Sequence, residues 1–288
     1  MPVFSINGRR CDPQDAKVSV MDHGFLYGDG VFEGLRFYSG RVLLLNEHLK
    51  RLKASADALR MTLPMSPGDI RAAIYDVVEA TGLKDGYLRL VVTRGEGPLG
   101  VDPTHCSNGQ LIIIADTLSL VDADIRAAGA KLIIAGTRRL AGDQLDSRIK
   151  SLNYLNQIMA RLEANAAGAD EAVVLNQAGC VAEGTADNVF IAQSGALITP
   201  PVTDGALEGI TRGLIIALAS DNGIHVKERS LTPYDLYTAD ECFLTGTGAE
   251  LIPVREVSGR PLAQCPGDIF RSIEALFRRA LTEDRYFA

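Results

Sequence analysis

The order of strand-like and helix-like segments limits the fold of this chain more than any other feature. Beyond residue 130, segments typical of strands outnumber those typical of helices, and the two kinds do not alternate regularly. The strand-like segments are 130–136, 171–176, 188–193, 196–200, 225–228 and 241–248. A doubly wound parallel sheet needs regular alternation of strand and helix. The sequence therefore predicts a mixed α+β fold and disfavours a Rossmann sheet.

The N-terminal part follows the order strand, helix, helix, strand, strand. The first helix is expected over 46–61, with Asn46 as its cap. The second is expected over 66–82, where Ser66 and Pro67 are typical of a helix start and Gly82 of a helix end.

A break in the pattern divides the chain into two expected domains. It falls near "TLSLVDADIRAAG", between two apolar strand-like segments. We expect a small α+β domain at 1–118, a linker at 119–123 and a larger domain at 124–288.

Composition and charge exclude several classes of function. The net charge is −7, which disfavours a general nucleic-acid binder. No apolar segment is long enough to span a bilayer and no signal-peptide pattern is present, so we expect no membrane partner and a cytoplasmic protein. The five cysteines are scattered and the four histidines lack ligand spacing, so we expect neither a disulfide framework nor a metal site.

The familiar nucleotide and hydrolase motifs are missing. "GTGAEL" contains Gly246 and Gly248, but it lacks a third glycine and runs into another strand-like segment. Neither GxxxxGKS/T nor GxSxG occurs.

Lys150 in "SRIKSLNYL" is expected to open a helix. On that helix Tyr154 would lie one turn away on the same face, and Leu152, Leu155, Met159 and Leu162 would form the core stripe. The positive end of a helix favours a neutral amine, which Schiff-base chemistry requires. By spacing alone, however, most such lysines are solvated.

Four other features permit binding of a phosphate or a cofactor. "EGITRG" places Ile210 and Thr211 at the start of an apolar helix, where free N–H groups bind anions. "TGTG" follows a buried strand, and its small residues allow close approach of a ligand. Taken alone, the first is more often an ordinary helix start and the second an ordinary turn. Similarly, Arg51 alone would be a solvated side chain and Glu183 alone a turn carboxylate.

Read together, these segments resemble the fold-type IV pyridoxal-phosphate aminotransferases, and most closely the branched-chain amino acid aminotransferases. The resemblance runs from "DHGFLYGDGVFEGLRFYSG" to "FLTGTGAELIPVREV", with the motifs in family order. It implies a two-domain fold, pyridoxal 5'-phosphate as cofactor and a ping-pong transfer of an amino group between amino acids and 2-oxo acids. It also implies a homodimer or a higher homo-oligomer.

The resemblance assigns catalytic and cofactor-binding roles. Lys150 matches the lysine that forms the Schiff base, Tyr154 the tyrosine at the phenolic oxygen, and Glu183 the partner of the pyridine nitrogen. The residue that packs on the cofactor ring and the residues around its phosphate match Leu207, Arg51, Ile210, Thr211, Gly246 and Thr247.

The resemblance also implies a substrate, because "VFEGLR" and the Tyr-x-Arg strand are typical of enzymes for leucine, isoleucine and valine. Tyr27, Phe32 and Tyr87 would line an apolar pocket, and Arg89 would meet the second carboxylate of glutamate or 2-oxoglutarate. The α-carboxylate would meet the Thr247–Gly248 turn. The residues left to tune specificity are Arg36, Arg94 and the 94–100 loop.

Three related activities share the same cofactor residues. They are D-amino acid transamination, (R)-amine transamination and the aminodeoxychorismate lyase reaction. A non-catalytic protein that holds pyridoxal phosphate is an alternative from another class, and the intact set of cofactor residues argues against it.

Overall fold

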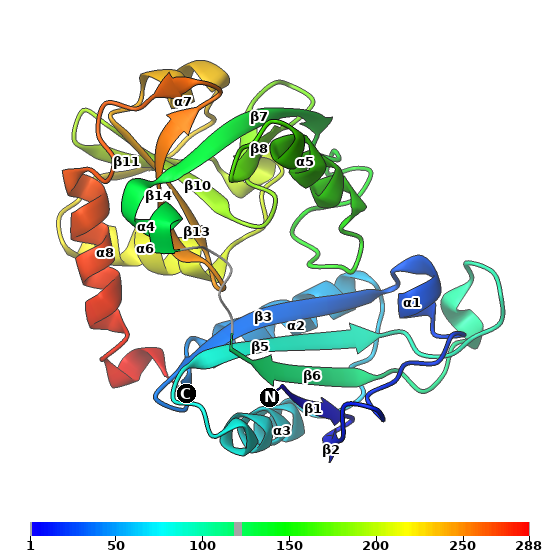
Figure 1. The fold of residues 1–288 in the computed structure, drawn as a ribbon. Helices are drawn as coiled ribbons and strands as arrows, with labels where there is room; N and C mark the ends of the chain where they lie inside the picture. Colours follow the sequence, from blue (N-terminus) through cyan, green and yellow to red (C-terminus); the bar gives the residue numbers. More distant parts are fainter. Residues whose placement is uncertain (1, 118–122, 288) are drawn as a thin grey trace. The chain divides into compact units, whose positions relative to one another are not determined.

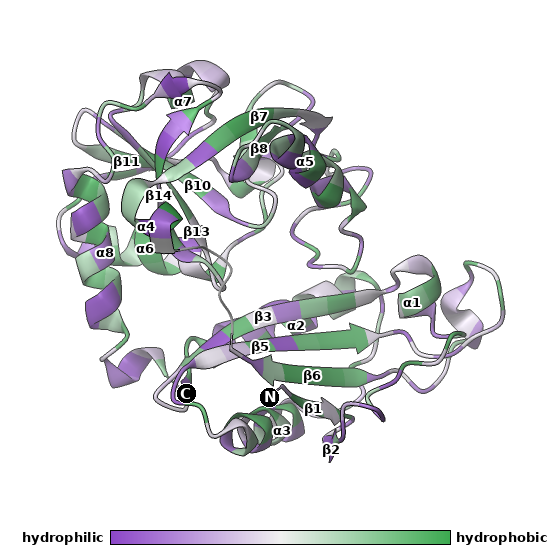
Figure 2. Cartoon of the chain, viewed as in Figure 1, coloured by the Kyte–Doolittle hydropathy of each residue, from purple (hydrophilic) through white to green (hydrophobic). Residues whose placement is uncertain are grey.

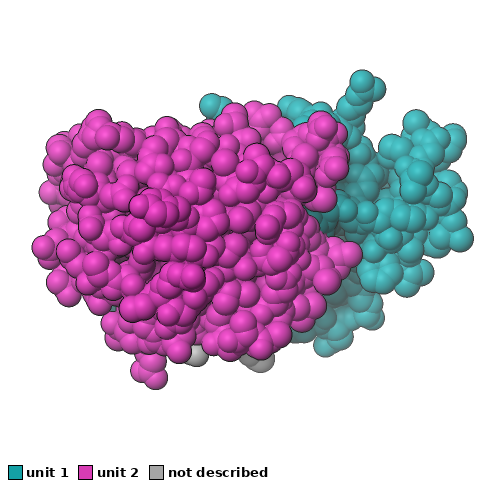
Figure 3. Space-filling model, turned by 90° about the horizontal axis from the view of Figure 1, so that it is seen from above, with its two compact units in different colours: residues 1–118, 149–153, 283–288 teal, residues 119–148, 154–282 magenta. Residues whose placement is uncertain are grey.

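The computed structural model describes residues 2–117 and 123–287, which group into two compact units (Figure 3). Unit 1 comprises Met1–Leu118, Ile149–Asn153 and Glu283–Ala288, and unit 2 comprises Ser119–Arg148 and Tyr154–Thr282. The first boundary falls where the sequence pattern breaks. The expected second domain, 124–288, differs from unit 2 because the segment around Lys150 and the C-terminal residues group with unit 1.

Unit 1 is built on a six-stranded antiparallel sheet with strand order β2-β1-β6-β5-β3-β4 (Figure 1). Its strands are β1 (Val3–Ile6), β2 (Arg9–Cys11), β3 (Gly30–Tyr38), β4 (Arg41–Val42), β5 (Gly86–Thr93) and β6 (Leu111–Asp116). Strand β6 is predominantly hydrophobic in Figure 2, as its isoleucine run requires.

Two helices cover one face of this sheet, α2 (Leu45–Ala58) and α3 (Pro67–Thr81). Unit 1 also contains α1 (His23–Tyr27) and the short 3-10 turns η1 (Pro103–His105) and η3 (Asp284–Tyr286). Alternate residues of β3, β5 and β6 point at α2 and α3 and form the core. The opposite face of the sheet carries the intervening residues, several of which are predicted site residues.

The ends of α2 and α3 test the predicted caps. Ser66 accepts a hydrogen bond from Asp69 N at 3.2 Å, and Gly82 takes a left-handed conformation with φ 64°, so both predicted ends of α3 are confirmed. The predicted cap Asn46 is wrong. Helix α2 begins one residue earlier, its N-cap is Leu44, and the Asn46 side chain instead accepts a hydrogen bond from Arg71.

Unit 2 contains a nine-stranded mixed sheet with the order β12-β11-β10-β13-β14-β7-β8-β9, with β15 paired to β14. Strand β7 runs parallel to β14 and β8, and β11 runs parallel to β12, whereas the other pairs are antiparallel. The strands are β7 (Ala130–Arg138), β8 (Glu171–Leu175), β9 (Val181–Glu183), β10 (Asn188–Gln193), β11 (Ala196–Thr199), β12 (Val226–Glu228), β13 (Glu241–Gly246), β14 (Glu250–Val257) and β15 (Arg260–Pro261). The mixed α+β prediction is confirmed.

The helices of unit 2 are α4 (Ala123–Ala128), α5 (Leu155–Ala166), α6 (Ile210–Asp221), α7 (Pro233–Thr238) and α8 (Asp268–Ala280), with a 3-10 turn η2 (Val202–Asp204). Most of the expected linker, 119–122, lies outside the described residues, and Ala123 already begins α4, so the linker prediction is wrong at that residue. Within the described residues, no helix combines the length and apolar character needed to cross a membrane.

Helix α5 corrects the prediction made for the segment around Lys150. It begins at Leu155, so Lys150 lies outside the helix and shares no helix face with Tyr154, which is the N-cap. The argument from the positive helix end therefore does not apply to Lys150.

The predicted core stripe of α5 is also wrong, because the side that packs on β7 and β8 carries Ala160 and Ala164. The stripe faces solvent instead. The exposed fractions are 71% for Leu155, 48% for Met159 and 54% for Leu162.

Candidate functional site

The predicted site residues fall into two groups, one in each unit. Unit 1 holds Tyr27, Phe32, Arg36, Arg51, Tyr87, Arg89, Arg94 and Lys150. Unit 2 holds Tyr154, Glu183, Leu207, Ile210, Thr211, Gly246, Thr247 and Gly248.

The segment that contains Lys150 pairs with the first residues of β3. Phe32 N donates to Lys150 O at 2.9 Å, and Leu152 N donates to Gly30 O at 2.9 Å. Ser151 forms an isolated antiparallel bridge with Val31. These hydrogen bonds fix the backbone of the lysine segment against the central sheet of unit 1, although the two segments are remote in sequence.

One aromatic ring lies near two basic side chains, on the sheet face opposite α2 and α3. The Phe32 ring centroid is 4.5 Å from Lys150 Nζ and 4.5 Å from Arg89 Cζ. The Arg89 guanidinium also lies 5.6 Å from the Tyr87 ring centroid. The sheet therefore brings the Lys150 amine, the Phe32 and Tyr87 rings and the Arg89 guanidinium close together.

Gly34 makes room for Tyr87 on this face. A Cβ atom at Gly34 would lie 2.2 Å from the Tyr87 hydroxyl, much closer than ordinary contact. Burial, the largest effect, raises the pKa of Tyr87 although the Arg89 charge opposes it. The hydroxyl is therefore protonated at neutral pH. Arg36 lies opposite Tyr87 in the strand register, and its guanidinium is 5.8 Å from the Tyr38 ring centroid.

Arg51 is held by a buried carboxylate on the other face of the same sheet. Its Nε and Nη2 donate to Glu33 Oε1 and Oε2 at 2.8 and 2.7 Å. His48 Nδ1 lies 2.7 Å from Glu33 Oε2. Burial alone would raise the pKa of Glu33, but the Arg51 charge, hydrogen bonds and His48 lower it to about 2. Glu33 is thus an anion over the whole physiological range.

Two of the predicted substrate-side residues have structural partners. The Tyr27 hydroxyl accepts a hydrogen bond from Gly100 N at 2.8 Å, so this tyrosine holds the end of the 94–100 loop. Arg94 donates to both carboxylate oxygens of Asp29 at 2.8 and 2.9 Å, and to Leu59 O at the end of α2. Arg94 therefore fastens this loop to α2.

Glu183 is the best-anchored predicted residue of unit 2. It ends strand β9 and is 6% exposed. Its Oε1 lies 2.7 Å from Arg139 Nη2, and its Oε2 accepts a hydrogen bond from Leu207 N at 2.8 Å. Asn188 Nδ2 donates to Leu207 O at 3.0 Å. These contacts join Glu183 and Leu207, two predicted cofactor residues, in one hydrogen-bonded group.

The start of helix α6 and the β13–β14 turn meet at two threonines. Gly209 is the N-cap of α6 and provides no side-chain hydrogen bond, so Ile210 and Thr211 lie in a first turn whose N–H groups receive no bond from an N-cap side chain. Thr211 Oγ1 is 3.5 Å from Thr247 Oγ1. The predicted phosphate residues of unit 2 are therefore adjacent.

Two positions near the start of α6 and the β13–β14 turn have no space for a side chain. A Cβ atom at Gly209 would lie 1.9 Å from Asn188 Oδ1, and one at Gly246 would lie 2.3 Å from Asp187 Oδ1. Gly246 ends β13, and Gly248 lies in the turn that leads to β14. Side chains at Gly209 and Gly246 would displace polar groups beside the threonines.

Sequence reasoning missed several polar residues that complete these groups. Glu33 and His48 carry a signal that could have been read, since an acidic residue within an apolar strand and a histidine three residues before Arg51 both need partners. Arg139 and Asn188 give no such signal, because their roles depend on chain segments that are remote in sequence.

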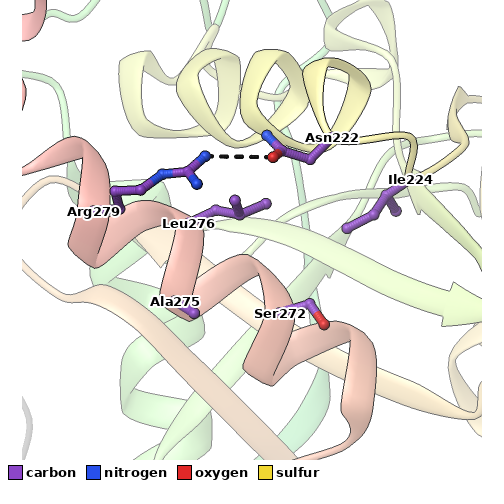
Figure 4. A pocket seen from close by; sticks show the side chains of 6 residues that line it. All are labelled: Asn222, Ile224, Ser272, Ala275, Leu276 and Arg279. Atoms are coloured by element: carbon purple, nitrogen blue, oxygen red, sulfur yellow. Dashed lines mark hydrogen bonds between the residues drawn. The ribbon is translucent and has the colours of Figure 1, made fainter.

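A surface depression in unit 2 lies apart from all predicted residues. It has a volume of about 440 Å³ and lies between α6 and α8, where Arg279 donates to Asn222 Oδ1 at 3.3 Å (Figure 4). Its other lining residues are Ile224, Ser272, Ala275 and Leu276. The lining offers a single cationic side chain and no group suited to proton transfer.

Comparison with known proteins identifies the family. The family model described as amino-transferase class IV matches residues 30–257.

The chain belongs to the class IV aminotransferases.

Relatives of this class IV aminotransferase resemble it over nearly its whole length. A putative branched-chain-amino-acid aminotransferase of Methanocaldococcus jannaschii is 46% identical over 280 residues, which are 96% of each chain. The crystal structure of the branched-chain aminotransferase from Thermoproteus uzoniensis with norvaline has a TM-score of 0.93 and 35% identity, covering 99% of this chain and 98% of that one. The branched-chain amino acid aminotransferase from Thermobaculum terrenum in its PLP form has a TM-score of 0.88 and 30% identity, covering 99% and 95%.

Class IV aminotransferases use pyridoxal phosphate, and the residues present fit this group. Thr211 and Thr247 lie beside the uncapped start of α6, which suits a phosphate. Glu183 is a buried carboxylate that can accept a hydrogen bond from a protonated ring nitrogen. Lys150 would supply the amine that binds an aldehyde.

Proposed function

We propose that this class IV aminotransferase transfers the amino group of leucine, isoleucine or valine to 2-oxoglutarate by a ping-pong reaction with pyridoxal phosphate. The observation that carries the proposal is the Phe32 ring, which lies 4.5 Å from both Lys150 Nζ and Arg89 Cζ. An apolar side chain fits against the ring, whereas the second carboxylate of glutamate is suited to Arg89. One face can thus serve both substrates. The named relatives support the same substrate class.

The residues of unit 1 would hold and protonate the reacting groups. When bound, pyridoxal phosphate supplies an electron sink for the electron pair of the substrate Cα–H bond. Lys150 Nζ would hold the cofactor at its aldehyde carbon until the substrate amine takes its place. The Lys150 amine, when it is not bonded to the cofactor, would take the proton from the substrate Cα and later give it back. Arg51 binds the phosphate, and Phe32 and Tyr87 exclude water from the substrate side chain.

The residues of unit 2 would orient the cofactor. Glu183 accepts a hydrogen bond from the protonated ring nitrogen, and Arg139 holds this carboxylate in place. Ile210 and Thr211 at the start of α6, with Gly246 and Thr247, bind the phosphate. Leu207 packs on the ring, and Tyr154 donates to the phenolic oxygen. Gly248 and Thr247 receive the α-carboxylate of the substrate.

The absorption spectrum and half-reactions test this proposal. Wild-type protein with pyridoxal phosphate should show a near-visible absorption band that Lys150→Ala lacks. L-leucine should convert the bound cofactor to its amino form, and D-alanine and (R)-phenylethylamine should not. Absence of the band in the wild type would refute the cofactor assignment, and conversion by D-alanine alone would refute the substrate assignment.

We also propose a homodimer or a higher homo-oligomer, with the exposed stripe of α5 as part of the interface. Leu155, Ile158, Met159 and Leu162 recur at helical spacing and are each at least 48% exposed. Contiguous apolar patches on soluble proteins usually mark contact surfaces. Light scattering should give a smaller mass for Leu162→Glu than for the wild type. An unchanged mass would remove α5 from the interface.

Free amino acids and 2-oxo acids are the partners, and the scattered cysteines support a reducing compartment such as the cytoplasm.

A further inference from the structure

One face of α2 carries three polar residues that form hydrogen bonds with Glu33 or with the backbone of Lys150. His48, Arg51 and Ser55 are three and four residues apart, so they lie on the same side of the helix. His48 and Arg51 contact Glu33 of β3, and the Ser55 hydroxyl accepts a hydrogen bond from Lys150 N at 3.1 Å. We call Glu33, His48, Arg51 and Ser55 the α2 polar cluster.

Glu33 is not explained by stability alone. It is 0% exposed and points toward the same helices as Val31, Leu35 and Phe37, which belong to the apolar core. Burying a charge costs several kcal/mol, and replacing a buried ion pair with apolar side chains is often neutral or stabilising. An ion pair at this position is therefore expected to serve function. What it does in the structure is hold the guanidinium of Arg51 by two hydrogen bonds of fixed geometry.

Ser55 holds the backbone of Lys150 from α2, while β3 holds it from the sheet. The Lys150 carbonyl accepts a hydrogen bond from Phe32 N of β3, and its amide donates to Ser55 of α2. Ser55 is 2% exposed, so this bond is shielded from water. The backbone of Lys150 is thus held between a strand and a helix, which limits where its amine can reach.

We propose that Glu33 and His48 are positioning residues for Arg51, and that Ser55 is a positioning residue for Lys150. Helix α2 then fixes the position of the Arg51 guanidinium relative to the Lys150 amine. This inference rests on the proposed function, in which Arg51 binds the cofactor phosphate and Lys150 binds its aldehyde.

Binding of pyridoxal phosphate and of pyridoxal, which lacks the phosphate, separates the two roles. Both would be titrated into cofactor-free protein and followed by absorption. Glu33→Gln should weaken pyridoxal phosphate binding about tenfold, the effect of disturbing a charge-assisted hydrogen bond, and leave pyridoxal binding unchanged. Ser55→Ala should weaken both compounds equally. Inorganic phosphate should compete less well in Glu33→Gln and equally well in Ser55→Ala.

Matched controls are Glu47→Gln, an exposed position on the same helix, and Ser272→Ala, an exposed position on α8; both should bind like the wild type. If Glu33→Gln does not fold, His48→Leu should give the phosphate-specific loss and His48→Asn should restore binding.

Two results would overturn the inference. They are wild-type affinity in the cluster variants, or an equal loss for both compounds in Glu33→Gln. A wild type that binds neither compound would overturn the proposed function as well, so the two failures are distinguishable.

Discussion

The contact between Gly34 and Tyr87 tests how tightly the sheet face opposite α2 and α3 is packed. In Gly34→Ala the new Cβ would lie 2.2 Å from the Tyr87 hydroxyl and 3.0 Å from Cζ, whereas ordinary contacts begin at 3.4 Å. The hydroxyl must therefore move by about 1.2 Å. Gly34 lies inside β3 and its neighbours on the other face are buried, so the strand cannot yield easily. Overpacking of this kind costs about 1–3 kcal/mol.

The displacement should affect the substrate more than the cofactor. Because Tyr87 lines the proposed apolar pocket, a misplaced ring should raise KM for L-leucine by about tenfold, or about 1.4 kcal/mol, while the cofactor band is retained. Urea unfolding and the leucine half-reaction measure the two effects. Gly213→Ala is the matched control for KM, because a Cβ there meets nothing within 4 Å. Wild-type stability and KM in Gly34→Ala would refute the argument.

Four further predictions concern helix α6 and the buried pair Glu33 and His48. Gly209→Ala should weaken phosphate binding at the start of α6, because its Cβ would displace Asn188 Oδ1 at 1.9 Å; an unchanged Kd for inorganic phosphate would contradict this. Gly213→Ala should stabilise the protein by about 0.5–1 kcal/mol in thermal unfolding. Gly213 is an exposed residue within α6, and alanine loses less conformational entropy than glycine when a helix forms. The lowered pKa of Glu33 contributes stability above pH 4.5 that is lost as the pH falls toward about 2, at most about 3 kcal/mol. The lowered pKa of His48, due to burial, should also reduce stability below pH 6.5, and acid unfolding of His48→Leu should lack this part.

Local signals in the sequence predicted the elements whose ends depend on neighbouring residues. Ser66 and Gly82 bound α3 because a cap hydrogen bond and a left-handed turn need only adjacent atoms. The predicted start of α5 was wrong because Ser151 pairs with Val31, which lies 120 residues earlier. A helical period cannot reveal a competing strand partner so far away in the chain.

In α5 the helical spacing of the apolar residues was predicted correctly, but their burial was not. Leu155, Met159 and Leu162 recur at helical spacing, but the small residues Ala160 and Ala164 allow the opposite side to pack closely on the sheet. Apolar periodicity predicts that a face will be covered, and it does not state whether this chain or another chain covers it.

The motif residues could be picked out from the sequence, whereas most of their hydrogen-bond and ion-pair partners could not. Thr211 and Thr247 come from two recognisable motifs and lie together in the structure. By contrast, the contacts of Arg139 with Glu183 and of Ser55 with Lys150 join remote segments of chain. Such partners are ordinary residues in sequence and become distinctive only after folding.

The pairing of residues 149–153 with β3 has a consequence for dissecting this protein. The chain passes between the two units four times, and the last residues return to unit 1, where Leu43 bridges to Phe287. A fragment that ends at residue 118 would lack both of these late segments, so its β3 would present unpaired backbone groups. Such a fragment should be prone to aggregate. During synthesis, unit 1 can be completed only after nearly the whole chain has emerged, because residues 283–288 belong to it.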